Sequence, residues 1–319
     1  MRKLKCLLRP LKDPRADNTR HDLVDIVIIA LAATLSGARS CTEFEFFGYG
    51  RLELLRRFLE LRHGIPSHGT FSNVLRALDP KGLDAVLRKF SKGFGIKGVV
   101  SIDGKALCGA FTRGRKATPL HMVNVWAAGM RMALAQRKAP NRNEIAGALE
   151  ILALLDLDGA IVTADALHCR PRHGAGHPQS EGALCVGDQK QSRQALQGGR
   201  FPDIAAVGRI DCWRSDGSKT AKHTVRYFLA SRLLPARSLL EIVRAHWSIE
   251  NNLHWVLDVL LDEDACRSRK DHAAENLALI RKLALNFLQA TPDPARISHR
   301  ILKTKWDNDF LLTALGHMR

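Results

Sequence analysis

The sequence has few cysteines, and none of the seven forms a C-x-x-C pair. An odd number of unpaired cysteines argues against a disulfide framework and a zinc ribbon, and it fits the reducing cytoplasm. Long apolar runs are also missing: the longest, Leu23 to Leu35, is interrupted by Asp25 and is too short to span a bilayer. The N-terminal stretch MRKLKCLLRPLKDPR has no clean apolar core with a cleavage site, so no signal peptide is expected.

Negative charge is also in short supply. Lys and Arg number 49 against 32 Asp and Glu, which gives a formal net charge of +17. Since Lys and Arg displace the counterions of phosphates, an excess this large is typical of proteins that bind nucleic acid. The alternative is a solvated basic surface without a partner. The basic residues are spread along the chain, so no single tail carries the charge.

The first 95 or so residues have the apolar spacing of helices. The chain has 319 residues, 45% of them hydrophobic, so it can bury a large core in two domains or in one elaborate domain. Helices are predicted over 22–35, 52–61 and near 83–90, with another after the loop HGIPSHG, where Ser67 or Thr70 could be the N-cap. A glycine-rich break, KGFGIKG, follows.

After this break the pattern changes to strands. Short strands are predicted over 99–103, 120–127 and 130–138, followed by an amphipathic helix over 143–157 and a strand over 160–165. Far downstream, 239–261 has the pattern of one long helix that contains Glu250. The order is therefore three strands, a helix and a fourth strand, as expected of a mixed α/β sheet.

Two aspartates, Asp103 and Asp165, each end one of these strands. A single Asp after a strand is most often a turn or cap residue. In a mixed sheet, however, adjacent strand ends meet at one edge, and two carboxylates there repel each other unless a cation lies between them. Oxygen ligands of this kind suit Mg²⁺ or Mn²⁺.

A helix that crosses this edge could supply a third carboxylate, and Glu250 is the candidate. Its neighbours at helical spacing include Trp247, Leu253 and His254, so it lies on a partly apolar face, where an unpaired Glu is costly. The alternatives are a surface ion pair between Glu250 and Arg244 or a nearby Lys, or another acid in its place. The acids nearby are Asp258, Asp262, Glu263 and Asp264.

Strand order and carboxylate placement together predict a ribonuclease-H-like fold. This fold class is a mixed sheet with catalytic carboxylates at strand ends, here preceded by an all-helical N-terminal region and followed by C-terminal helices. Its members cut or join phosphodiesters with two metal ions held by acidic ligands.

Five segments resemble the DDE-type insertion-sequence transposases, in particular the H-repeat-associated branch. HDLVDIVIIALAATLSGA and GIPSHGTFSNVLRALDP are similar to the family's helical N-terminal region. The segment with the family's first catalytic Asp resembles VVSIDGKAL, and the segment with its second resembles GAIVTADALHC. The segment with its catalytic Glu resembles RAHWSIENNLHWVLDVLLDEDACRSRKDHAAENLALIRKLALN. The resemblance covers nearly the whole chain. It implies a helical region over 1–95, a catalytic core over 98–289 and a C-terminal tail over 290–319.

The resemblance also implies an activity. Asp103, Asp165 and Glu250 would be the catalytic residues and would hold Mg²⁺ or Mn²⁺. They would cleave double-stranded DNA at the ends of the element and transfer the strands into target DNA. A homo-oligomer on DNA is expected, in the cytoplasm and associated with the nucleoid when bound. The alternatives are a DNA-binding remnant without catalysis and a ribonuclease-H-like nuclease without strand transfer.

The chain departs from the family pattern in three places. Gly69 stands where the family usually has Asp. The segment RPRHGAGHPQSEGALCVGDQKQSRQAL has no helical period, and we hypothesise that 170–197 is a frameshifted translation. A His-Gly-Arg…Glu-x-Arg motif is missing after it, which predicts an internal deletion and a copy with reduced or no activity. A metal site within this segment is disfavoured, because the spacing fits no zinc pattern; its members would be His168, Cys169, His173 and His177.

Overall fold

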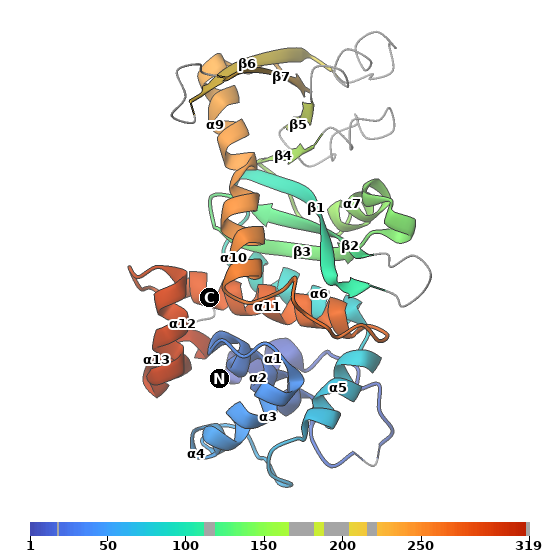
Figure 1. The fold of residues 1–319 in the computed structure, drawn as a ribbon, viewed down its shortest axis with the longest axis vertical. Helices are drawn as coiled ribbons and strands as arrows, with labels where there is room; N and C mark the ends of the chain where they lie inside the picture. The colour runs from blue at the N-terminus through green and yellow to red at the C-terminus, as the bar shows by residue number, and fades with distance from the viewer. Residues whose placement is uncertain (18, 112–118, 166–181, 188–203, 216–221, 317–319) are drawn as a thin grey trace.

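The computed structural model describes residues 1–17, 19–111, 119–165, 182–187, 204–215 and 222–316. As predicted, the chain is helical before residue 95. The helices here are α1 (Arg2–Leu8), α2 (Leu23–Leu35), α3 (Cys41–Gly50), α4 (Leu52–Arg56), α5 (His68–Ala77) and α6 (Pro80–Lys92). They form the lower half of the molecule in Figure 1.

The centre of this lower half is α2. Every residue of α2 except Val24 is buried, as expected of a helix that is apolar on all sides. Its N-terminus is capped by the Asp22 side chain, which accepts a hydrogen bond from the backbone N–H of Asp25. Helices α3, α5 and α11 (Ala273–Ala290) all pack against α2. The predicted helix over 22–35 is thus confirmed and forms the core of the helical region.

Two predicted helices are too long. The helix over 52–61 ends at Arg56, and the helix over 143–157 is α7 (Glu144–Leu152). Leu59 and Leu61 beyond the first, and Leu155 and Leu157 beyond the second, are nevertheless buried. The apolar spacing past each helix end therefore comes from loops that pack into the core, which periodicity alone does not distinguish from a helix.

One mixed sheet of seven strands forms the upper half. The strands are β1 (Gly98–Phe111), β2 (Pro119–Ala127), β3 (Met132–Lys138), β4 (Ala160–Ala164), β5 (Gly182–Gly187), β6 (Ala206–Arg214) and β7 (Lys222–Ala230). Their order is β3-β2-β1-β4-β5-β7-β6. β4 runs parallel to β1 and to β5, and the other neighbours are antiparallel. The predicted strands are all present, although β1 is much longer than 99–103.

Helices cover the sheet and link it to the lower half. Helix α7 packs on β2 and β3, whereas α9 (Ala236–His246) packs on β1. Figure 1 shows α9 and α10 (Trp255–Val259) running down the sheet and α11 passing between the two halves. Helix α11 contacts α2, α5 and α6 as well as β3. It therefore joins the helical region to the sheet, and α12 (Ile297–Trp306) and α13 (Asn308–Gly316) pack beside it.

Most of the irregular segment 170–197 lies outside the described residues, as do His168, Cys169, His173 and His177. The exception is β5, which pairs with β4 from Ile161↔Gly182 to Ala164↔Cys185. A strand therefore extends the sheet beside β4. Among the described helices, none combines the length and the apolar character needed to cross a bilayer.

The cap of α5 gives a first test of the fold. Ser67 Oγ accepts a hydrogen bond from the backbone N–H of Thr70 at 3.3 Å. We expect Ser67→Ala to lower the free energy of unfolding by about 1 kcal/mol, because one helix-terminal N–H loses its partner. Urea unfolding of the full chain measures this, with Ser67→Asp as the matched control that keeps an acceptor. Equal stability of Ser67→Ala and the wild type would contradict the assigned cap.

Candidate metal centre at the sheet edge

Asp103 lies within β1 rather than at its end, so the predicted strand end is wrong. β1 continues to Phe111 because β2 pairs with it beyond this point. Its pairing with β4, in contrast, stops at Ile102↔Ala164. Asp103 is thus the first residue of β1 beyond its paired segment with β4, and Asp165 directly follows β4. The two aspartates occupy adjacent positions where these parallel strands part.

Glu250 comes from the helical run that descends across the sheet. The predicted helix over 239–261 contains α9 and α10, but between them lies one π-helical turn, η3 (Glu250–His254). Single π-turns within helices occur frequently at functional sites. Glu250 begins this turn and His254 ends it.

Asp103, Glu250 and His254 form one cluster. Each offers a ligand atom, and these atoms lie within 4.8 Å of one another. His254 Nδ1 is 3.4 Å from Asp103 Oδ2 and 3.4 Å from Glu250 Oε2. The side chain of His254 is only 7% exposed, whereas that of Glu250 is 51% exposed. The cluster therefore has a buried base and opens toward solvent on the Glu250 side.

Negative charge is concentrated at this cluster. Burial, followed by the charges of Glu250 and Asp165, raises the pKa of Asp103 to about 8. The pKa of Glu250 is lowered, chiefly by its hydrogen bond to His254. Ionising Asp103 is therefore costly here, because neighbouring carboxylates cannot all be charged at low cost without a cation. Of the three predicted residues, the structure brings Asp103 and Glu250 into the cluster. Asp165 is not one of its members, although its charge contributes to the raised pKa of Asp103.

The comparison with known proteins identifies the family. Residues 95–287 match the family model of the transposase DDE domain, and residues 6–91 match the model of the region associated with that domain. The chain belongs to the DDE transposase family. This confirms the resemblance found in the sequence and, with it, the predicted class of function, an insertion-sequence DNA transposase.

Two relatives from Escherichia coli with transposase names support this placement. The chain is 28% identical to "H repeat-associated putative transposase YhhI" of Escherichia coli K12, over 93% of each chain. It is also 28% identical to "Putative transposase YncI" of Escherichia coli O157:H7, over 86% of this chain and 84% of that one. A cryo-EM structure of the piggyBac transposase synaptic complex with hairpin DNA aligns over 97% of this chain and 78% of that one, with 12% identity and a TM-score of 0.48.

The other acids considered in place of Glu250 form ion pairs outside the cluster in this transposase. Lys105, two residues beyond Asp103 on β1, forms ion pairs with three of them: Asp258, Glu263 at 2.9 Å and Asp264 at 3.8 Å. The fourth, Asp262, pairs with Arg39 at 3.3 Å. The ion-pair partner of Glu250 is His254 and not Arg244. Glu250 is therefore the acid that completes the cluster.

His254 is the member of the cluster that the sequence did not single out. Its position four residues after Glu250 placed both side chains on one face of the predicted helix, and that was the available signal. The helical spacing does not predict which strand residue lies against this face of the helix. That depends on the sheet register, which places Asn124 of β2 opposite Asp103.

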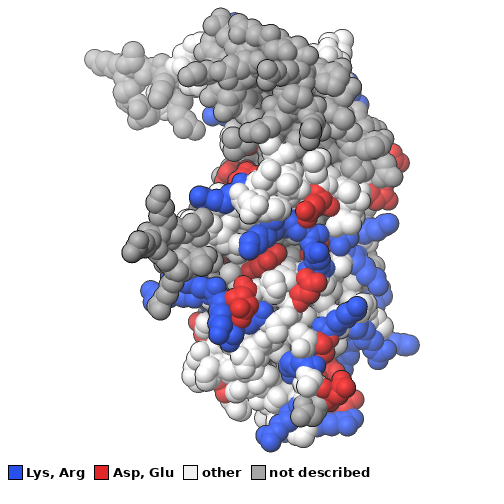
Figure 2. All heavy atoms as spheres, turned by 90° about the vertical axis from the view of Figure 1, so that its right-hand side faces the viewer, with Lys and Arg blue, Asp and Glu red and all other residues white. Residues whose placement is uncertain are grey.

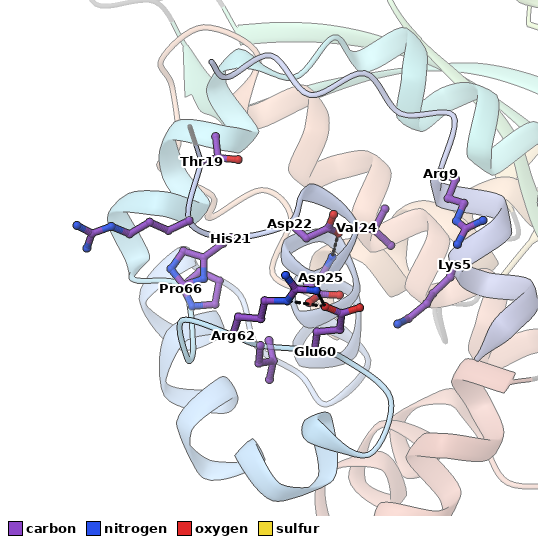
Figure 3. A pocket seen from close by; sticks show the side chains of 12 residues that line it. Lys5, Arg9, Thr19, His21, Asp22, Val24, Asp25, Glu60, Arg62 and Pro66 are labelled. Carbon is purple, nitrogen blue, oxygen red and sulfur yellow. Dashed lines mark hydrogen bonds and ion pairs between the residues drawn. The ribbon is translucent and has the colours of Figure 1, made fainter. Parts of the chain in front are cut away.

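A second polar cavity lies among the N-terminal helices, as Figure 3 shows. It has a volume of about 460 Å³. Its acids are already engaged: Arg62 pairs with Glu60 at 2.8 Å, and Asp22 caps α2. Burial raises the pKa of Asp25 at its base. Because charges of both signs offset one another here, we assign this cavity no part in the chemistry. Its lining residues are Lys5, Arg9, Thr19, Arg20, His21, Asp22, Val24, Asp25, Glu60, Leu61, Arg62 and Pro66.

Proposed function

We propose that this transposase cleaves the DNA at the ends of its insertion sequence and joins the strands to target DNA, with Asp103, Asp165 and Glu250 as its catalytic carboxylates. The convergence of Asp103 and Glu250, together with the effect of the Asp165 charge on Asp103, carries the proposal. The three residues come from the π-turn, from β1 and from the end of β4, which are far apart in the sequence. Nothing in ordinary stability favours placing like charges beside a largely buried carboxyl group, because their repulsion is costly.

The donor set fits a divalent cation such as Mg²⁺ or Mn²⁺. Oxygens of the Asp103 and Glu250 carboxylates and a ring nitrogen of His254 lie within 4.8 Å of one another. The charge of Asp165 contributes to the raised pKa of Asp103. Hard cations of this kind prefer carboxylate oxygens. When bound, two such ions supply Lewis acid chemistry that activates the attacking hydroxyl and stabilises the leaving oxygen. Asp103, Asp165 and Glu250 would hold them.

Hydrogen bonds near the proposed site link the strands to the helical run. Thr163 of β4 has its Oγ1 2.9 Å from Nδ1 of His246 in α9 and 3.3 Å from Oγ of Ser101 in β1. Trp126 of β2 donates from Nε1 to Ser248 Oγ at 3.2 Å, just before the π-turn. These contacts join β1, β2 and β4 to the helical run. Such links between the elements that carry the proposed catalytic groups support the positioning that phosphoryl transfer requires.

We also infer that β1 to β5 form a ribonuclease-H-like core. Three antiparallel strands, helix α7 and the parallel strand β4 follow one another in the predicted order. The aspartates stand where β1 and β4 part. This arrangement supports the predicted core over 98–289, after the helical region over 1–95 and before the segment over 290–319.

We propose double-stranded DNA as the partner. The net charge of +17 supports this proposal. On the face drawn in Figure 2, Lys and Arg side chains are spread over the middle and lower parts of the molecule, with acidic side chains between them. A distributed basic surface of this kind neutralises phosphates at many points and gives affinity without sequence recognition.

This binding mode predicts a steep dependence on salt. For about six to ten neutralised phosphates, the affinity for a DNA duplex should fall by about 10³ to 10⁵ between 50 and 200 mM salt. Fluorescence anisotropy of a labelled duplex, titrated with the full chain at several salt concentrations, measures the slope. An affinity that hardly changes over this range would show that the positive charge is not used on DNA.

The test of the proposed function is a cleavage and joining assay. The full chain is incubated with duplex DNA that bears the element's ends, with Mg²⁺ or with a chelator, and the products are separated by size. We expect nicked ends and joined products with Mg²⁺ and none with the chelator, formed at the reduced rate that the predicted internal deletion implies. DNA binding without either product would identify a DNA-binding remnant, and cleavage without joining would identify a ribonuclease-H-like nuclease.

A further inference from the structure

The two ring nitrogens of His254 face different polar groups. Nδ1 faces the carboxylates of Asp103 and Glu250, at 3.4 Å from each. Nε2 lies 3.5 Å from the side-chain nitrogen of Asn124. Asn124 is fully buried and stands directly opposite Asp103 in the β1–β2 pair. The histidine therefore bridges the carboxylates and a buried amide.

The amide of Asn124 has an unpaired atom. Its Oδ1 has no hydrogen-bond partner among the described residues, and a buried oxygen left unpaired is costly. A half-turn of the amide exchanges its oxygen and nitrogen, which have nearly the same shape. Oδ1 then lies against His254 Nε2 and accepts a hydrogen bond from the Nε2–H group, which leaves the lone pair of Nδ1 on the side of Asp103 and Glu250.

We propose that His254 is a nitrogen ligand of a divalent cation in this site and that Asn124 orients it. The inference rests on the proposed function, because Asp103 and Glu250 supply the oxygen ligands of the same cation. Histidines that bind metals commonly donate their other N–H to a protein oxygen, which fixes the tautomer and the ring orientation. Asn124 is placed to accept that hydrogen bond, and Nδ1 would bind the metal ion.

A nitrogen ligand makes the site distinguishable from one of carboxylates alone. Imidazole suits Mn²⁺ and later transition metals, whereas Mg²⁺ prefers oxygen. We therefore expect His254→Asn to weaken Mn²⁺ binding by about 10- to 100-fold, as for loss of a ligand or its support. Mg²⁺ binding should be weakened less, so the ratio of Mn²⁺ affinity to Mg²⁺ affinity should be smaller in the variant than in the wild type.

The experiment measures Mn²⁺ alone on the full chain by pulsed electron paramagnetic resonance. A histidine nitrogen bound to Mn²⁺ gives a nitrogen coupling, which changes when the histidines are labelled with ¹⁵N. We expect this signal in the wild type and its loss in His254→Asn. The matched control is His121→Asn. His121 lies on the same sheet but pairs with Glu144 at 3.2 Å, so this variant should keep the signal.

Variants of Asn124 test how His254 is oriented. Asn124→Leu removes the acceptor at similar size and should weaken Mn²⁺ binding by about tenfold or more. Asn124→Asp keeps an oxygen that accepts the Nε2 proton, so the nitrogen signal should remain. Similar Mn²⁺ affinity in wild type and Asn124→Leu would overturn the role of Asn124. Circular dichroism of each variant checks that it is folded.

The outcomes separate this inference from the proposed function. In one outcome, the wild type binds Mn²⁺, Asp103→Asn abolishes this binding, and the spectrum shows no coupling to a histidine nitrogen. This result would overturn the role of His254 but would leave the proposed carboxylate site unchallenged. Failure of the wild type to bind Mn²⁺ would overturn both. The wild-type spectrum decides between these results even if the His254 variant does not fold.

Discussion

Asp103→Asn should reduce DNA cleavage at least about a thousandfold, since losing a charged ligand of the metal removes several kcal/mol of transition-state stabilisation. Asn has nearly the same shape as Asp but no charge, so the fold of β1 should be retained. Glu250→Gln should have a similar effect. Affinity for the DNA duplex should stay the same or rise slightly, because a negative charge is removed. Single-turnover cleavage and equilibrium binding, measured on the same preparations, separate the two effects.

Glu144→Gln is the matched control for this loss. The Glu144 carboxylate lies against Gly104, so close that a Cβ on that glycine would be 2.2 Å from its carboxyl carbon. Adjacent residues of a strand face opposite sides of the sheet, and Glu144 is therefore next to β1 but away from Asp103. Its neutralisation should leave cleavage unchanged. If Glu144→Gln and Asp103→Asn lose activity equally, the site has been assigned to the wrong face.

The second large effect concerns stability. Lys105 and Lys282 surround the buried carboxylate of Glu263, at 2.9 and 3.3 Å. We expect Lys105→Met to lower the free energy of unfolding by about 3–5 kcal/mol, because it leaves the buried Glu263 without one of its two lysine partners. Urea unfolding measures this change. Lys92→Met is the control: Lys92 pairs with Asp156 at 3.9 Å on the surface, and such pairs contribute about 0–1 kcal/mol.

The same cluster predicts a dependence on pH. Burial alone would raise the pKa of Glu263, but Lys282, Lys105 and Arg281 outweigh it and lower that pKa to about 2. A folded pKa below the unfolded value of 4.5 means that Glu263 stabilises the fold above that pH. This contribution is lost as pH falls toward 2. Glu263→Gln should therefore flatten the acid limb of the stability profile, and an unchanged limb would contradict the assignment.

The strand that carries Asp103 and the strand that precedes Asp165 could be predicted, because a short apolar run comes before each residue. The extension of β1 beyond Asp103 could not, because Gly104 and Gly109 look like breakers. In the structure they permit close approach instead. A Cβ on Gly109 would lie 2.5 Å from the backbone oxygens of Asp264 and Cys266. These contacts come from distant segments, so local sequence patterns do not contain them.

Glu250 was predictable for a different reason, which is its resemblance to a family motif. Its place on a partly apolar helix face did not distinguish Glu250 from the acids nearby as the third carboxylate. The structure shows that those acids form ion pairs with Lys105 and Arg39. The contact between His254 and Asn124 could not be predicted from the sequence pattern at all. Their meeting depends on the register of β1 and β2 and on where the π-turn falls, neither of which apolar spacing determines.

The most direct test of the carboxylate site is anomalous scattering from crystals of the full chain soaked in MnCl₂. The account predicts a manganese peak about 2 Å from carboxylate oxygens of Asp103 and Glu250, with Asp165 at the same centre. A peak at Asp258, Glu263 or Asp264 instead, or no peak beside Asp103 at saturating Mn²⁺, would contradict it.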